Sequence, residues 1–189
     1  PYSIAHAKLH LAAVLAAQSA PAKQQEALQI TQELITSEHL SASFRSWAHA
    51  LTAEVLLENR QFAQAAHSAR NALSSANVVP LRRMICHAIL IKCLLGQGQI
   101  QEARTAADTA LTTMGELGGG GYAELDILLS VAEALHASGA TESAVQIVDQ
   151  SLMKVEARAA AFSSAEAATH YRQQVRIHLR LNARQREWR

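Results

Sequence analysis

The chain has 189 residues, of which 49% are hydrophobic, only 4% are aromatic and 38 are alanine. Because alanine is the best helix former and a poor strand former, this composition favours closely packed helices and argues against a sheet. The formal charge is +1, but residues 1–162 carry 11 Lys/Arg and 14 Asp/Glu whereas residues 163–189 carry six Arg and two Glu, so the basic character belongs to the C-terminus alone.

Two cysteines, Cys86 and Cys93, lie seven residues apart within one expected helix. Their Cα atoms would be ~10 Å apart along its axis, which is too far for a disulfide. Free thiols, the absence of a signal-peptide pattern and the absence of an apolar run of ~20 residues predict a soluble, cytoplasmic protein without a membrane span. The chain begins at Pro1 and ends in a charged helix, so we expect an excised piece of a longer protein.

An internal repeat organises most of the chain. Four segments can be superposed on shared alanines that recur 38, 38 and 41 residues apart, namely Ala27, Ala65, Ala103 and Ala144. Small or apolar residues follow each alanine at +4, +7 and +8, which marks one face of a helix. Another apolar helix lies upstream of each segment, and three of these helices carry a similar tripeptide centred on His6, His49 and His87.

The predicted unit is therefore a helix, a short turn and a second helix. The pairs are 4–17 with 22–37, 43–58 with 62–76, 80–96 with 100–115, and 122–138 with 142–161, within repeats 4–39, 43–77, 80–116 and 122–161. Pro80 suits the first turn of its helix, Gly98 and Gly139 suit turns inside pairs, and Gly118 to Gly121 suit a flexible link. A last helix spans 163–189, where Ser163 and Glu166 have capping-box spacing.

Small side chains at the shared positions let antiparallel helices approach the near end of the usual 8–10 Å separation. Each pair leaves an apolar flank that a neighbouring pair covers. The sequence thus predicts an all-α fold, an α-solenoid of about four antiparallel helix pairs with a C-terminal capping helix, in a single domain over 1–189. The first helix, Ile4 to Ala17, is apolar nearly all round, so we expect an upstream repeat or a second copy of the chain, in a homodimer, to cover it.

These features resemble the tetratricopeptide repeat (TPR) superfamily over residues 4–161. The family's two alanines of the second helix match the four shared alanines and then Ala72 and Ala110, with Ser151 in the fourth repeat. The first-helix aromatic is replaced by His6, His49, His87 and Leu128, and the closing proline is absent. In repeat length, and in the run from Leu128 to Gly139, the chain is similar to arrays in large bacterial multidomain regulators, where such arrays sense or dock partners.

The resemblance implies a concave groove lined by the first helix of every pair. The family's inward positions correspond to Trp47, Glu54, Leu57, Ile85, Lys92, Leu95, Asp126, Leu129, Glu133 and His136. A surface that mixes apolar side chains with a net acidic set suits an extended or helical segment that carries basic residues. The alternative is that these charges are ordinary solvated side chains.

The last helix carries an arginine ridge at i+4 spacing, formed by Arg172, Arg176, Arg180 and Arg184. Apolar residues flank it on both sides, with Tyr171, Val175 and Leu179 on one flank and Ile177, Leu181 and Trp188 on the other. Three interpretations remain open: a solvated outer face of the cap, a docking surface for another domain or protein, and a track for nucleic-acid phosphates. The acidic remainder of the chain disfavours nucleic acid.

Patterns that could carry chemistry fail on spacing. Stacked helices would place His6, His49 and His87 ~10 Å apart, too far to share one zinc ion. Ser151 and Lys154 match the Ser-x-x-Lys of penicillin-recognising acylases, but the accompanying Ser-Asp-Asn and Lys-Thr-Gly elements do not occur in the sequence. We therefore expect no enzyme, no cofactor and no metal site.

Taken together, the sequence predicts a non-catalytic interaction or scaffold module that binds a peptide or protein segment in its groove, as part of a bacterial signalling or transcriptional regulator. The alternative, from another functional class, is an effector-sensing regulatory domain that binds a small molecule or oligonucleotide.

Overall fold

The computed structural model describes residues 2–18, 20–74 and 79–189. Over these ranges the chain is all-helical, with no strand, as the sequence predicts. The elements are α1 (Tyr2–Ala16), α2 (Pro21–Thr36), α3 (Ala42–Glu58), α4 (Phe62–Leu73), α5 (Pro80–Gly96), α6 (Ile100–Glu116), η1 (Gly121–Ala123), α7 (Glu124–Ala137), α8 (Thr141–Ala160), α9 (Ala165–Gln174) and α10 (Arg176–Trp188). The predicted ends at residues 76 and 77 lie outside the described residues.

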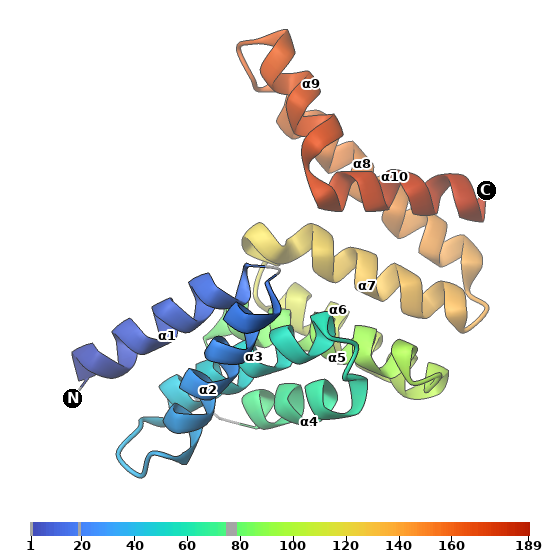
Figure 1. The fold of residues 1–189 in the computed structure, drawn as a ribbon. Coiled ribbons are helices and arrows are strands. Elements are labelled where there is room, and N and C mark those ends of the chain that lie inside the picture. Colours follow the sequence, from blue (N-terminus) through green and yellow to red (C-terminus); the bar gives the residue numbers. More distant parts are fainter. Residues whose placement is uncertain (1, 19, 75–78) are drawn as a thin grey trace.

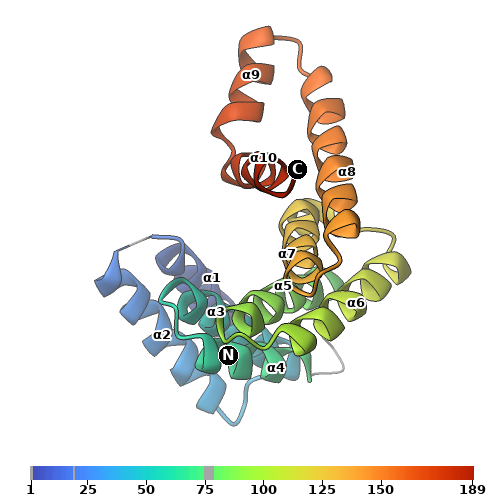
Figure 2. The same ribbon diagram turned by 90° about the vertical axis from the view of Figure 1, so that its right-hand side faces the viewer.

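The first eight helices form two rows (Figure 1). Helices α1, α3, α5 and α7 pack each against the next and form what we call the inner row, while α2, α4, α6 and α8 form the outer row. Each of α2, α4 and α6 packs between two consecutive inner helices. Within the described residues, no Cα atom of one outer helix lies within 8 Å of another outer helix. Figure 2 shows the inner row on the inside of a curved array.

The turns within three successive helix pairs share one hydrogen-bonding pattern. The backbone N–H groups of Gln61, Gln99 and Ala140 donate to the carbonyls of Leu56, Leu94 and Leu135, each at 2.9 Å. The residue before each donor has a positive φ, 57° at Arg60, 73° at Gly98 and 89° at Gly139. This left-handed residue closes a helix C-terminus in the Schellman manner, and glycine adopts it without the steric cost that Arg60 incurs.

The recurring alanines lie in equivalent packed positions. Ala65, Ala103 and Ala144 are fully buried, and Ala27 is 1% exposed. The residues one and two turns further on are buried as well, including Ala69, Ala72, Ala107 and Ala110. Small side chains therefore let each outer helix approach the two inner helices that it bridges.

The C-terminal segment differs from the single helix predicted over 163–189. It divides at Val175, whose extended backbone (φ −79°, ψ 117°) ends α9 and precedes α10. The N-cap of α9 is Ser164, which accepts a hydrogen bond from the Ala167 N–H, and not the predicted Ser163. After the break, α10 packs against α8 and reaches α7, and Leu181 is fully buried in the core there. Burial of this apolar side chain stabilises the bent arrangement.

The imidazole of His178 completes the bend. It is buried, and its Nδ1 lies 2.8 Å from the carbonyl oxygen of Tyr171, in the last turn of α9. A carbonyl at the end of a helix has no partner within its own helix, so this contact satisfies a group that the break would leave unpaired.

In the described part of the chain, no helix is both long enough and apolar enough to cross a membrane.

Candidate functional site

The predicted groove residues come from three neighbouring helices of the inner row. Lys92 of α5 and Asp126 of α7 meet, and Glu54 of α3 lies within electrostatic range of both. Leu129 is fully buried and belongs to the core, so it offers no surface to a partner. The remaining aliphatic members of the set, Leu57, Ile85 and Leu95, are half-buried and pack against the core.

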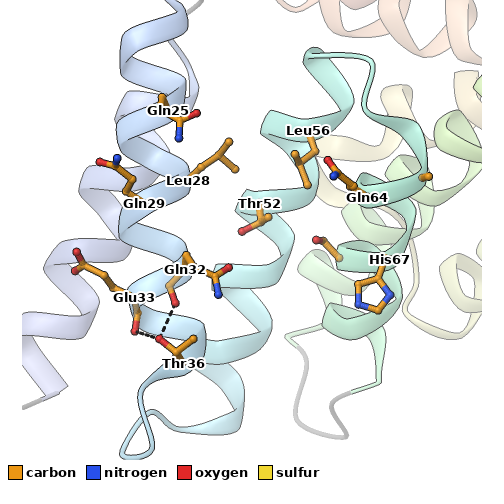
Figure 3. A pocket seen from close by; sticks show the side chains of 12 residues that line it. Gln25, Leu28, Gln29, Gln32, Glu33, Thr36, Thr52, Leu56, Gln64 and His67 are labelled. Atoms are coloured by element: carbon orange, nitrogen blue, oxygen red, sulfur yellow. Dashed lines mark hydrogen bonds between the residues drawn. The ribbon is translucent and has the colours of Figure 1, made fainter.

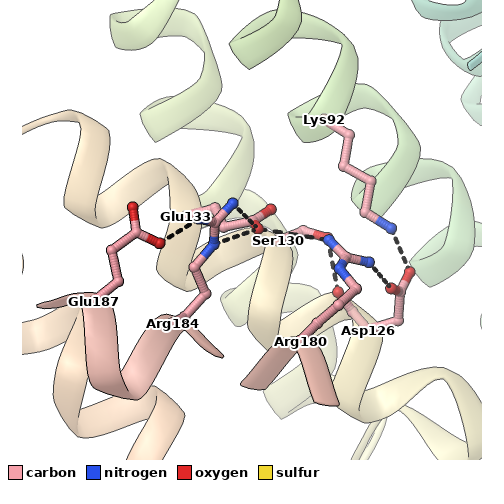
Figure 4. A network of polar contacts seen from close by, with 7 residues as sticks. All are labelled: Lys92, Asp126, Ser130, Glu133, Arg180, Arg184 and Glu187. Atoms are coloured by element: carbon pink, nitrogen blue, oxygen red, sulfur yellow. Dashed lines mark hydrogen bonds and ion pairs between the residues drawn. The ribbon is translucent and has the colours of Figure 1, made fainter. Parts of the chain in front are cut away.

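The acidic residues of α7 are already paired within the chain (Figure 4). The Lys92 Nζ lies 2.5 Å from Asp126 Oδ2, and the Arg180 guanidinium lies 3.3 Å from Asp126 Oδ1 and 3.5 Å from Glu133 Oε1. Arg184 donates from Nε and from Nη2 to Glu133 Oε1, both at 3.1 Å. The Glu133 side chain is only 14% exposed. Two of the carboxylates that the sequence offers to a partner are therefore neutralised by the chain itself.

An aromatic contact continues this interface toward the C-terminus. The rings of His136 on α7 and Trp188 on α10 stack with centroids 4.4 Å apart and an interplanar angle of 12°. Together with the ion pairs, this stack means that α10 covers the inner side of α7 along the predicted positions 126, 133 and 136.

The arginine ridge does not remain one surface. Arg180 and Arg184 face α7, whereas Arg172 lies on α9 and pairs with Glu156 of α8 at 2.8 Å. Arg176 is exposed and makes no ion pair with any described residue. The break at Val175 explains the separation, because i+4 spacing aligns side chains only along an unbroken helix.

The part of the inner row that α10 leaves uncovered centres on Trp47. The Arg82 guanidinium of α5 lies 4.8 Å from the Trp47 ring centroid, a cation–π distance, and the His10 ring of α1 meets Trp47 edge-on at 5.0 Å. Neither Arg82 nor His10 is among the groove residues predicted from the sequence. Arg82 could have been found from its spacing, because it precedes Ile85 by one helical turn and so shares its face.

Glu54 is the carboxyl group on this wall that lacks a direct partner. It is half-buried and forms neither a hydrogen bond nor an ion pair with any described residue. Burial, followed by repulsion from Glu58, raises its pKa to about 7, while Lys92 and Arg82 act in the opposite direction. A cation placed beside Glu54 would favour its ionised form.

The histidines and cysteines do not assemble a site in the described part of the chain. No group of three or more His, Cys, Asp or Glu side chains is close enough to hold a metal ion there. His6 is exposed, His49 is half-buried and His87 is buried, so these three do not share one environment. Both cysteines are fully buried, and burial raises the thiol pKa to about 12 at Cys86 and about 11 at Cys93.

None of the protein-family models, curated proteins or solved structures with which the chain was compared matches it.

Proposed function

We propose that this chain is a non-catalytic interaction module whose inner wall binds a basic peptide or protein segment. By inner wall we mean the inward side of α1, α3 and α5 around Trp47 and Glu54, bounded by α10. The proposal rests on the packing of α10 against α7. Helix α10 carries arginines one turn apart, and these arginines form ion pairs with carboxylates of the inner row.

The contacts of α10 indicate how a partner would be recognised. Arg180 and Arg184 lie one turn apart and approach Asp126 and Glu133, and Trp188 adds an aromatic contact one turn further on. A partner helix or extended segment with Lys or Arg would meet the same kind of surface at Glu54, beside the exposed Glu58. Charge complementarity of this kind favours association and selects against acidic partners.

The proposed architecture is a TPR-like superhelix of four antiparallel helix pairs closed by a C-terminal cap. The shared turn geometry at Arg60, Gly98 and Gly139 and the buried alanines at the repeat positions support it. The resemblance further suggests a cytoplasmic bacterial signalling or transcriptional regulator as the setting.

A peptide-display selection tests the proposal even though the natural partner is unidentified. Random 15-residue peptides would be selected on the wild-type chain and then assayed on Glu54→Lys and on Glu116→Lys. Both variants change the charge by the same amount, but Glu116 is exposed at the end of α6, away from the inner wall. We expect the selected peptides to be rich in Lys and Arg and to lose most of their binding to Glu54→Lys alone.

Selected peptides without a basic bias would refute the proposal. So would peptides that bind Glu54→Lys and Glu116→Lys equally well, provided that circular dichroism shows both variants to be folded.

We also propose a homodimer through α1. Its outward face exposes Ile4 (64%), Leu11 (48%) and Val14 (60%), whereas each later inner helix packs against a preceding outer helix. Light scattering at high concentration is expected to give twice the chain mass, and Leu11→Lys is expected to give the monomer mass. A monomeric wild type would exclude this interface.

A further inference from the structure

A groove separate from the inner wall lies between the outer-row helices α2 and α4 (Figure 3). Its volume is about 880 Å³, and its base is formed by Leu28 of α2 with Thr52 and Leu56 of α3. The groove exists because α2 and α4 both pack on α3, while no Cα atom of α2 lies within 8 Å of a Cα atom of α4. On its α4 side the small residues Ala63 and Ser68 leave the space open.

Some of the polar side chains around the groove already have partners. Thr52 bonds Thr31 and the Ala48 carbonyl, and Glu33 forms an ion pair with Lys8 of α1. His67 lies within hydrogen-bonding distance of Asn71. The lining side chains without a hydrogen bond to any described residue include four amides, those of Gln25, Gln29, Gln32 and Gln64. Each amide offers two N–H donors and one carbonyl acceptor.

The neighbouring groove between α4 and α6 provides an internal comparison. It is smaller, about 380 Å³, and the ion pair between Arg70 and Glu102, at 3.6 Å, spans it. Counted from the shared alanines, Arg70 is equivalent to Gln32 and Glu102 is equivalent to Gln64. The first groove thus has two uncharged amides where the second has an ion pair that bridges its walls.

The spacing and charge of the lining select the kind of ligand. Gln25 and Gln29 are one turn apart, ~6 Å along the helix axis, which is close to the ~6.6 Å two-residue repeat of an extended chain. A helical ligand would have little use for these amides, because its backbone groups are bonded internally. A charged ligand would lose hydration without a free counter-charge in the groove, because the Glu33 carboxylate is already paired with Lys8.

We propose that this groove binds an uncharged, extended peptide segment. The backbone amides of the segment pair with Gln25, Gln29, Gln32 and Gln64, and one of its apolar side chains lies on Leu28 and Leu56. This site is independent of the inner wall. The groove lies between two outer-row helices, and it recognises backbone amide groups instead of charged side chains.

The test uses the smallest peptide unit as its probe. N-acetyl-leucine N-methylamide would be titrated into the full isotope-labelled chain, and the glutamine side-chain amides would be followed by NMR. We expect saturable shifts at the four groove glutamines with a dissociation constant of ~1 mM, as is reasonable for so small a ligand. The corresponding lysine and glutamate derivatives are expected to bind several-fold more weakly.

The matched variant is Gln32→Arg with Gln64→Glu, which transfers the bridging ion pair of the second groove into the first. We expect it to stay folded and to bind the leucine probe ~10-fold more weakly, because two amide partners are lost and the groove is bridged. Gln173→Arg with Gln174→Glu introduces the same charges on exposed positions of α9 and is expected to bind as the wild type does.

Three results would overturn the proposal. One is unchanged binding by the bridged variant, another is equal binding of the charged probes, and the third is shifts spread over glutamines outside the groove. Loss of inner-wall binding in the Glu54→Lys experiment would leave this site unaffected, so the two proposals can fail separately.

Discussion

Replacing Glu54 by glutamine is predicted to stabilise the protein at pH 8 and to change its stability little at pH 5. The pKa of Glu54 is raised from its usual 4.5 to about 7, first by burial and then by Glu58. The folded state therefore binds this proton more tightly than the unfolded state does. This tighter proton binding adds to the free energy of unfolding. The added free energy is fully present below pH ~4.5, is lost as the pH rises toward 7, and stays absent above pH 7. Glutamine has the same shape but no proton to lose.

The size of the effect follows from the same pKa. At ~1.4 kcal/mol per pKa unit, the rise from 4.5 to about 7 sets a ceiling of ~3 kcal/mol. Because the side chain is only half-buried, solvent screening reduces the expected gain to ~1–2 kcal/mol. For a chain of this length, such a gain raises the melting temperature by ~2–8 °C.

Urea unfolding followed by circular dichroism at pH 5 and pH 8 measures this difference. Glu116→Gln, at an exposed position, is the control and should change stability little at either pH. Equal stabilisation by Glu54→Gln at both pH values, or none at pH 8, would refute the reasoning. A confirmed gain would mean that Glu54 is maintained at a cost to stability, as is common for residues with a binding role.

Three further predictions concern the cap, a turn and the thiols. Arg184→Ala should destabilise the chain by ~1–3 kcal/mol in urea unfolding, because it weakens the pairing of a mostly buried carboxylate, whereas Arg176→Ala on the same helix should have little effect. Arg60→Gly should stabilise by ~0.5–1 kcal/mol in the same assay, because glycine adopts the positive φ without strain. Cys86 and Cys93 should react with Ellman's reagent only as the chain unfolds, since both thiols are buried and have raised pKa values.

The helices and their packed faces could be predicted from the sequence because they depend on local rules. Proline at the start of α5 and the glycines of two turns mark boundaries that hold in the structure. Alanines recurring every 38 to 41 residues are buried as the spacing indicates. These features depend on spacing within one helix or between neighbouring helices. Such spacing can be read from the periodicity of the sequence.

The bend at Val175 could not be predicted in this way, because no proline or glycine marks it. It depends on Leu181 reaching the core beside α8 and on His178 bonding the Tyr171 carbonyl. A signal was nevertheless present. Apolar residues flank the arginines on two different faces, which a single straight helix packed on one side does not need.

The sequence identifies charged residues on the inner-row helices but not the residues with which they pair. Lys92, Asp126 and Glu133 lie on the inner-row helices α5 and α7, and all three are paired within the chain. Which charges remain available depends on α10, a helix more than 40 residues further along the sequence than Glu133. Sequence spacing says which side chains share a face, whereas tertiary packing decides which of them are already neutralised.

This distinction narrows the proposed binding surface. With the α7 carboxylates engaged by Arg180 and Arg184, Glu54 is the inner-wall acid that a basic partner could still pair with. A segment bound there would lie between α1 and the edge of α10. Helix α10 therefore forms one boundary of the site, in addition to packing against α8. Selectivity would then come from few contacts, one cation at Glu54 and an apolar group near Trp47. Weakening the α10 contacts should therefore enlarge the set of peptides that bind.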